Sequence, residues 1–112
     1  MARQWNGMNW IKPAKRQAIY DRDGHCCIYC GGNGDDSRLT LDHLKAVELS
    51  GTNHSGNLVT CCLTCNSMKG KKSLSGFLAY LEKKGIEIVE VKKRIKRHIA
   101  RKLKGYTERR AK

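Results

Sequence analysis

Two copies of the pattern Cys-x-x-Cys constrain the fold of this 112-residue chain more than any other feature of its sequence. The first copy contains Cys27 and Cys30, the second contains Cys62 and Cys65, and 31 residues separate them. Four thiolates supplied by two such pairs are the usual ligands of a tetrahedral structural zinc site. Because four thiolates complete the coordination of the ion, such a zinc has no open position for a substrate. We therefore predict that the zinc holds the fold together.

The composition is consistent with a fold that needs a metal. Apolar residues make up 39% of the chain and there is one Phe, so the core is modest, and small cores often depend on a metal or on disulfides. The alternative use of six cysteines is the disulfide framework of a secreted protein. The first residues lack the apolar run of a signal peptide, and no stretch approaches the length of a membrane span. We expect a cytoplasmic protein that makes no membrane contact.

Two further cysteines, Cys26 and Cys61, each precede the first cysteine of a pair. Free cysteines are commonly small buried apolar residues, and we expect this for both. The alternative is a shifted register in which Cys26 or Cys61 binds the metal. His25 could also compete for the metal, although we expect its side chain in solvent beside the first pair.

The positive charge of the chain is large and unevenly placed. The formal net charge is +13, and residues 86–112 contain eleven Lys and Arg against three Glu, a net charge of +8. Lys and Arg concentrated in this way are typical of a surface that neutralises phosphates and releases counterions. A surface that is merely solvated and soluble is the alternative. Together with a zinc module, the charge favours nucleic acid as the partner, and the sequence does not identify a protein partner.

We expect a single domain in three parts: an N-terminal helical segment (1–24), a zinc-stapled core (25–72) and a helical, strongly basic extension (73–112). Pro13 suits the first turn of a helix, and Gly24 suits the end of that helix. Apolar and polar residues alternate at first in the segment after the Gly-rich loop, which indicates a strand. The first two parts are expected to contain a helix at 14–21, loops at 31–37 and 50–56, strands at 39–44 and 57–60, and a helix from the second cysteine pair to residues 68–70.

Two more helices are expected in the basic extension. Apolar residues at 74, 77, 78 and 81 have helical spacing, with Ser73 as a possible N-cap and Gly85 as the end. Beyond them Val91, Ile95, Ile99 and Leu103 recur every four residues among many Lys and Arg. The apolar stripe should pack on the domain, while the basic face meets phosphate. The residues that we assign to DNA contact, here and beside the second cysteine pair, are Lys69, Lys71, Lys72, Arg94, Arg97 and Arg101.

Four polar residues lie between and just after the cysteine pairs: Asp42, His43, Asn57 and Asn66. Hydrolysis of a phosphodiester needs a water made nucleophilic and a metal that takes up charge on the leaving oxygen. His43 suits the first role, because an imidazole that is largely neutral at cellular pH can accept a proton. Asp42 and the amide oxygen of Asn66 suit the second role, and oxygen ligands favour Mg²⁺ or Mn²⁺. Asn57 cannot exchange protons, so it would fix the ring of His43 or tie the loop to the strands.

The chain resembles the HNH endonucleases over roughly residues 16–72. The matching segments are Arg22-Asp23-Gly24, Cys27-Ile28-Tyr29-Cys30-Gly31, Leu41-Asp42-His43, the run from Asn57 to Asn66, and Lys69-Gly70. The resemblance implies a small α+β fold, the treble-clef-like ββα-metal core with flanking helices, and the same four roles for the residues above. The third position is Asn66 and not His, which looks like the HNN variant and makes a soft catalytic metal less favoured.

The resemblance implies a metal-dependent DNA endonuclease, acting on duplex DNA in a bacterial or phage-infected cell. The alternatives are a zinc-stapled module that binds nucleic acid without cutting it, and a nuclease directed at RNA.

The positions of Asp42 and His43 next to each other on a strand raise a geometric problem. Neighbours on a regular strand point to opposite faces, so we expect the strand to end, twist or bulge at Asp42 and His43. The target sequence, nicking as opposed to double-strand cutting, the biological pathway and the oligomeric state stay open.

Overall fold

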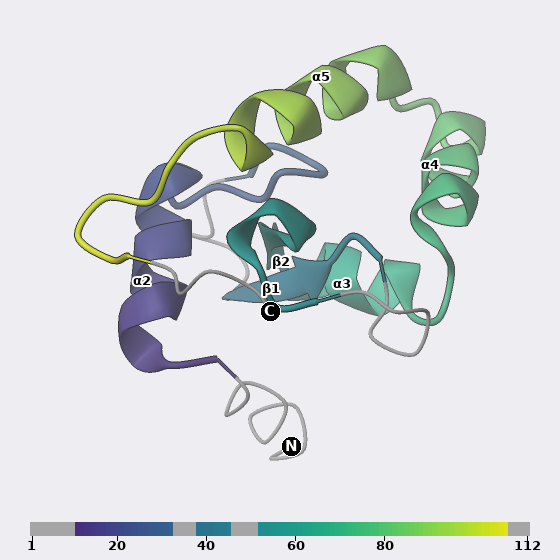
Figure 1. Ribbon diagram of the computed structural model, residues 1–112. Helices are drawn as coiled ribbons and strands as arrows, with labels where there is room; N and C mark the ends of the chain where they lie inside the picture. Colours follow the sequence, from purple (N-terminus) through teal and green to yellow (C-terminus); the bar gives the residue numbers. More distant parts are fainter. Residues whose placement is uncertain (1–10, 33–37, 46–51, 108–112) are drawn as a thin grey trace.

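The computed structural model describes residues 11–32, 38–45 and 52–107 (Figure 1). A two-stranded antiparallel sheet lies at the centre, with regular pairing from Leu39 opposite Cys62 to His43 opposite Leu58. Helices surround the sheet in the described part of the chain, and this arrangement confirms the expected small α+β fold. The elements are α2 (Pro13–Arg22), β1 (Leu39–His43), the 3-10 turn η2 (Ser55–Asn57), β2 (Leu58–Cys62), α3 (Leu63–Lys69), α4 (Leu74–Lys83) and α5 (Ile88–Ile99).

The helix ends follow the local signals in the sequence. Helix α2 starts at Pro13, and Gly24 just beyond it has a φ of +70°, a conformation that glycine adopts without strain. The side chain of Ser73 accepts a hydrogen bond from the backbone N–H of Gly76 at 3.0 Å, which caps α4 as expected. No helix in the described ranges is both long enough and apolar enough to cross a membrane.

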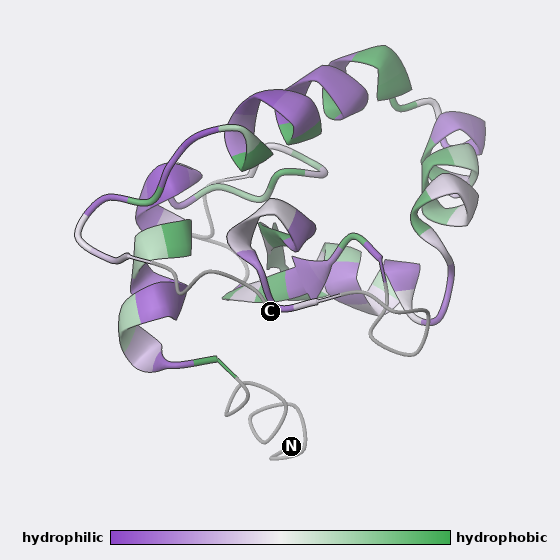
Figure 2. Cartoon of the chain, viewed as in Figure 1, coloured by the Kyte–Doolittle hydropathy of each residue, from purple (hydrophilic) through white to green (hydrophobic). Residues whose placement is uncertain are grey.

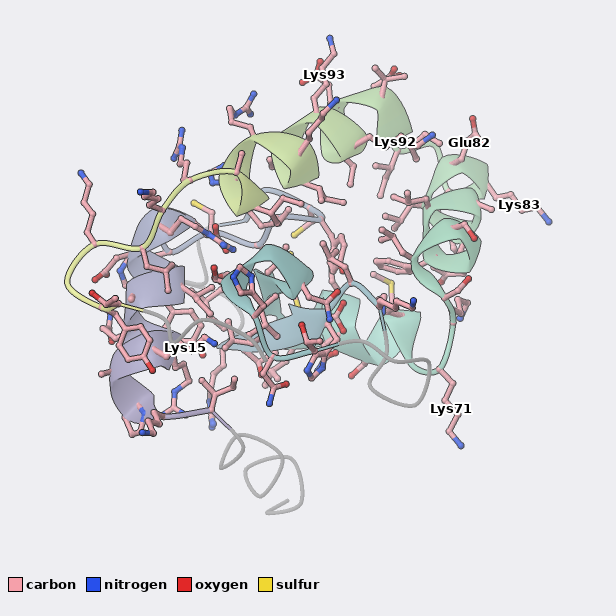
Figure 3. The ribbon with its side chains drawn as sticks, in the orientation of Figure 1. Lys15, Lys71, Glu82, Lys83, Lys92 and Lys93 are labelled. Atoms are coloured by element: carbon pink, nitrogen blue, oxygen red, sulfur yellow. The ribbon has the colours of Figure 1, made fainter. Side chains whose placement is uncertain are left out.

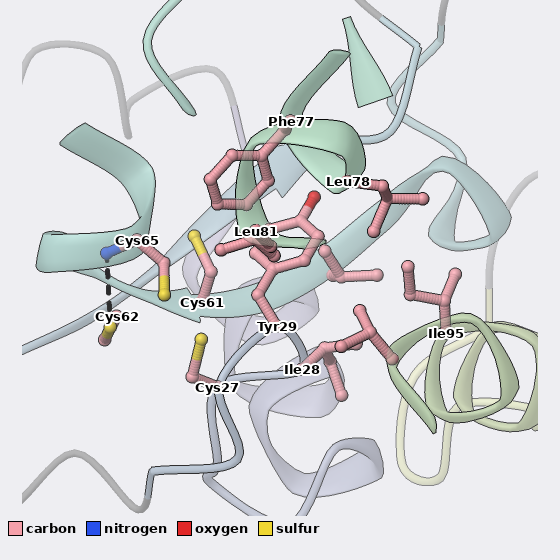
Figure 4. Packing of buried hydrophobic residues seen from close by; sticks show 12 residues of the cluster. Cys27, Ile28, Tyr29, Cys61, Cys62, Cys65, Phe77, Leu78, Leu81 and Ile95 are labelled. Atoms are coloured by element: carbon pink, nitrogen blue, oxygen red, sulfur yellow. Dashed lines mark hydrogen bonds between the residues drawn. The ribbon is translucent and has the colours of Figure 1, made fainter. Parts of the chain in front are cut away.

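Strand β2 is buried along its whole length, because α2, α3 and α5 all pack against it. Its side chains contribute to two apolar clusters. Val59 and Cys61 join the larger cluster, which includes Tyr29 and Phe77 and is shown in Figure 4. Leu58 joins the smaller cluster on the α2 side, with Leu41, Ile19 and Ile11.

The last expected helix is shorter than its apolar repeat predicted. Val91 and Ile95 are buried in the larger cluster and Ile99 packs against it, but α5 ends at Ile99. The chain then turns back towards α2 (Figure 1), and Leu103 packs against the smaller cluster. The prediction that Leu103 continues the helical stripe was therefore wrong. An apolar residue at the expected interval cannot by itself show that the backbone between is still helical.

A buried ion pair ties α2 to the strand that follows η2. The guanidinium of Arg22 lies 2.7 Å from the carboxylate of Asp23 and donates to the backbone oxygens of Ser55 and Leu58 at 2.8 and 2.7 Å. Asp23 in turn accepts the backbone N–H of Thr60 at 2.9 Å. A buried charge is tolerated when it is paired and its other hydrogen-bonding groups are satisfied. The segment Arg22-Asp23-Gly24 thus has a structural role, because it joins the end of α2 to η2 and β2.

Some of the expected features lie outside the described residues. These are the first ten residues of the segment 1–24, most of the loop expected at 31–37, the start of the loop expected at 50–56 and the last five residues of the extension. The described part of the second loop is not wholly irregular, since it contains η2. Asn57 ends this turn, and the second strand begins one residue later than predicted.

Candidate functional site

The four predicted zinc ligands come together in one cluster. The Sγ atoms of Cys27, Cys30, Cys62 and Cys65 all lie within 4.8 Å of one another, and those of Cys30 and Cys62 are 3.9 Å apart. A tetrahedral zinc with bonds of about 2.3 Å to sulfur requires sulfur atoms about 3.8 Å apart. Figure 4 shows the side chains of Cys27, Cys62 and Cys65 converging. The cluster is therefore positioned to hold a metal ion, and its four thiol donors suit zinc.

Backbone geometry prepares these sulfur atoms for a cation. The N–H of Cys30 points at the Sγ of Cys27 at 3.4 Å, and the N–H of Cys65 points at the Sγ of Cys62 at 3.3 Å. A hydrogen bond from the Cys65 thiol, helped by backbone N–H groups, lowers the pKa of Cys27 to about 5 despite its burial. The same bond raises the pKa of Cys65, which keeps its proton. A divalent ion bound in the cluster would favour the thiolate form of its ligands.

The two other cysteines stand outside this cluster. Cys61 is fully buried among apolar side chains, as expected. Cys26 is only half-buried, and its thiol points at the carbonyl oxygen of Gly24 at 3.3 Å, so the expectation of a buried Cys26 was wrong. His25 is exposed and its ring lies 2.7 Å from Asp21, as expected for a side chain in solvent. The structure therefore does not form the alternative ligand set, in which Cys26 or Cys61 would bind the metal in place of the next cysteine.

Asp42 lies near the end of β1, opposite Val59 of the larger apolar cluster. Its Oδ2 accepts a hydrogen bond from the hydroxyl of Tyr29 at 2.5 Å and lies 3.2 Å from the ammonium of Lys69. The Oδ1 atom lies 3.5 Å from the same ammonium. The side chains of Asp42 and Lys69 are 12% and 8% exposed, so this pair is shielded from water without being sealed off. The carboxylate therefore has one oxygen held closely by two donors and one held loosely.

Tyr29 was not among the predicted site residues, although it stands between the first two cysteine ligands. It is 1% exposed, and burial raises the pKa of its hydroxyl, with the charge and hydrogen bond of Asp42 acting in the same direction. The hydroxyl therefore stays protonated and donates to Asp42. The only signal in the sequence was its place inside the first cysteine pair, and that place does not say which way the ring points.

His43 ends β1 and faces away from Asp42, as strand geometry requires. Its Nε2 lies 2.8 Å from the amide oxygen of Asn53. In the tautomer with the hydrogen on Nε2, this nitrogen donates to Asn53 and Nδ1 is the basic atom of the ring. The ammonium of Lys15 on α2 holds the backbone oxygen of Asn53 at 2.5 Å. The strand ends at the pair, which is one of the three expected outcomes, and pairing stays regular up to that point.

Asn57 supports the loop and does not contact the ring of His43 through any of its three side-chain hydrogen bonds. Its Oδ1 accepts the N–H of Lys45 at 2.8 Å, and its Nδ2 donates to the carbonyl oxygens of Lys45 and Thr52 at 3.0 and 2.8 Å. Of the two roles considered for Asn57, tying the loop to the strands matches these contacts. Asn53 makes the contact with His43 instead, and nothing in its polar loop set it apart in the sequence.

Asn66 lies on α3 and is half-buried. Lys69, one turn further along, reaches the carboxylate of Asp42 and the backbone oxygen of His43 at 3.4 Å. Residues three apart lie on about the same side of a helix, so we expect Asn66 on the side of α3 that carries Lys69. Mg²⁺ is usually bound by one or two carboxylates, with water and phosphate oxygens completing an octahedron. A carboxylate such as that of Asp42 and an amide oxygen such as that of Asn66 are donors of the kind that such an ion takes.

The basic residues assigned to DNA contact divide into two groups. Lys71, Lys72, Arg97 and Arg101 are exposed, and Figure 3 shows Lys71 pointing away from the molecule. Lys69 is different, because it is 6% exposed and paired with Asp42. Lys69 is therefore not a solvated lysine at a helix end, and its ammonium belongs to the candidate site.

Arg94 is also engaged with the protein. Its guanidinium on α5 donates to the backbone oxygens of Ile28 and Tyr29 at 2.8 and 3.3 Å. It also packs close to Gly31, whose φ is +81°. These contacts join the basic helix to the turn that carries the first two cysteines. Arg94 therefore holds the cysteine turn in place, whatever it also offers to a polyanion.

The sheet, helix α3 and the cysteine cluster together define a ββα module with a candidate metal site. Residues 27–80 match the family model described as HNH endonuclease, and the chain thus carries a domain of the HNH endonuclease family. The match confirms the resemblance, and it runs from the first cysteine ligand into α4. It leaves the basic helix α5 outside. No curated protein and no solved structure gives a significant match to the chain.

Proposed function

We propose that this protein is a metal-dependent endonuclease that hydrolyses phosphodiester bonds of double-stranded DNA. The observation that carries the proposal is the placement of Asp42, His43 and Asn57 around the end of β1, next to α3 with Asn66, inside a domain of the HNH endonuclease family. A module that only binds nucleic acid has no use for this complete set. We also infer that residues 1–112 act as one nuclease domain, because α2 and α5 both pack on the sheet that carries the set.

In the proposed mechanism His43 is the general base. With Nε2 donating to Asn53, Nδ1 takes the proton from the attacking water. Asn57 keeps the loop that carries Asn53 close to the end of β1. Asp42 and Asn66 would hold a Mg²⁺ or Mn²⁺ ion, which stabilises the charge that develops on the leaving oxygen. A zinc ion held by the four cysteines would keep the frame rigid and take no part in the chemistry.

The test is incubation of supercoiled plasmid with zinc-loaded protein, with and without added Mg²⁺. We expect nicked or linear product only when Mg²⁺ is present, at a rate that saturates with protein. Leaving out chelators matters, because a chelator would also strip the cysteine cluster and unfold the protein. Binding that is tight in a gel-shift assay, together with intact plasmid in every divalent metal, would favour the non-cutting zinc module. Cleavage of RNA alone would favour the RNA-directed alternative.

Helix α5 is the proposed source of affinity for DNA. Figure 2 shows hydrophilic residues over most of its outer surface, and Figure 3 shows Lys92 and Lys93 pointing away from the core. We expect replacement of Lys92, Lys93, Lys96 and Arg97 by glutamine to weaken DNA binding. All four side chains are exposed, so the fold should survive. The slope of log affinity against log salt should become shallower by up to about 0.9 for each phosphate of duplex DNA that the variant helix no longer neutralises.

Lys83→Gln is a useful comparison for this variant, because it removes an exposed lysine on α4 that was not assigned to DNA contact. The decrease in slope per charge removed should be larger on α5 than at Lys83. Truncation after Gly85 is a poorer test, since it would also remove the buried Val91 and Ile95. A folded α5 variant with the wild-type salt slope would rule out this role for the helix.

A further inference from the structure

We propose that Tyr29 is a positioning residue for Asp42, through which the cysteine cluster controls how the candidate catalytic carboxylate binds its cation. The inference rests on the proposed function, since it takes Asp42 as a ligand of the divalent ion. Tyr29 stands between Cys27 and Cys30 in the chain, and its hydroxyl donates to Oδ2 of Asp42 at 2.5 Å. One side chain thus connects the two metal sites.

The ring of Tyr29 is fixed on every side. The rings of Tyr29 and Phe77 form a T-shaped pair with centroids 5.1 Å apart and an interplanar angle of 86°. Figure 4 shows it packed close to Phe77 and Leu81. Arg94 holds its backbone oxygen from outside. A ring held in this way loses little further freedom when its hydroxyl binds a carboxylate, so the hydrogen bond fixes the direction of Asp42 at small entropic cost.

The contacts of Asp42 leave its two oxygens in different states. Oδ2 has Tyr29 at 2.5 Å and Lys69 at 3.2 Å, whereas Oδ1 has Lys69 at 3.5 Å. A second donor on Oδ2 keeps the carboxylate from turning, so Oδ1 presents a constant direction to a cation. Removal of a residue that hydrogen-bonds to a metal ligand commonly lowers the affinity for the metal by about 10- to 100-fold. Lys69 supplies positive charge on a flexible side chain, whereas the fixed ring of Tyr29 sets the orientation of the Asp42 carboxylate.

The test measures Mn²⁺ binding to the zinc-loaded full-length protein without DNA, by electron paramagnetic resonance of the unbound ion. Tyr29→Phe keeps the ring and removes the hydroxyl, and we expect its Mn²⁺ affinity to fall by about 10-fold or more with zinc content unchanged. Tyr80→Phe is the matched control. It stacks on the same Phe77, and its hydroxyl points at the sulfur of Met68 at 3.9 Å. This variant should bind Mn²⁺ like the wild type.

Asp42→Asn separates the failure of this inference from that of the proposed function. If Asp42→Asn loses Mn²⁺ binding and Tyr29→Phe keeps the wild-type affinity, the positioning role is overturned and the proposed function stands. If Asp42→Asn itself binds Mn²⁺ normally, the metal role of Asp42 fails, and the role of Tyr29 fails with it. If Tyr29→Phe loses zinc, the inference is tested on the wild-type protein instead. Addition of Mg²⁺ must then shift the NMR signal of the Tyr29 hydroxyl proton, and an unmoved signal overturns the inference.

Discussion

Replacement of His43 by alanine is expected to slow DNA cleavage by about 10²- to 10⁴-fold, the usual contribution of a positioned general base. Zinc content, folding and DNA binding should stay unchanged, because the ring is partly exposed at the end of β1 and contributes to neither apolar cluster. The effect should appear in single-turnover cleavage of plasmid at saturating Mg²⁺.

His25→Asn is the matched control for this variant. His25 is exposed and has a φ of 56°, which asparagine tolerates better than alanine would. The control should cleave at the wild-type rate. If purified, folded His43→Ala also cleaves at that rate, His43 is not the base, and the non-cutting zinc module becomes the better interpretation.

A companion variant distinguishes the base from the proposed metal ligand. Asp42→Asn is preferable to Asp42→Ala, because it keeps an oxygen for Tyr29 and leaves a polar partner beside the buried ammonium of Lys69. Its activity should recover in part at raised Mg²⁺, whereas that of His43→Ala should not. Equal recovery of both variants would show that the two roles are wrongly assigned.

Replacement of Cys65 by serine is expected to release about one zinc per chain and to unfold the core. Cys65 is 2% exposed and lies in the larger apolar cluster, so the substitution would remove a metal ligand and the packing around it. Structural zinc contributes on the order of 10 kcal/mol to small metal-dependent folds, more than the net stability of a typical domain. Elemental analysis and circular dichroism of the purified variant would measure both effects.

Cys26→Ser is the control for the zinc prediction. Cys26 is only half-buried and its thiol faces a backbone oxygen, which a hydroxyl can also contact. The variant should keep its zinc and its fold. Cys61→Ser should also keep zinc, although a hydroxyl at that fully buried position costs about 1–3 kcal/mol unless it finds a partner. Full zinc retention in folded Cys65→Ser would refute the four-cysteine assignment.

Much of the fold was predictable because its signals are local. Proline and glycine marked the two ends of α2, Ser73 marked the start of α4, and alternation marked β1. The cysteine cluster was predictable for a different reason, since four thiols at that spacing have few other uses in a short chain. The errors came where a local pattern continued beyond its element, as it did from Ile99 to Leu103.

The sequence by itself determined the elements, the cysteines that are positioned for a metal ion and the match of residues 27–80 to the HNH endonuclease family model. Only the tertiary structure decided which side chains meet. Tyr29 reaches Asp42 across 13 positions of the chain, Lys69 reaches it across 27, and Arg94 reaches Ile28 across 66. Spacing along a chain says nothing about such contacts, because packing of whole helices on the sheet sets the direction of each side chain. The surroundings of the candidate catalytic carboxylate are therefore a property of the assembled core.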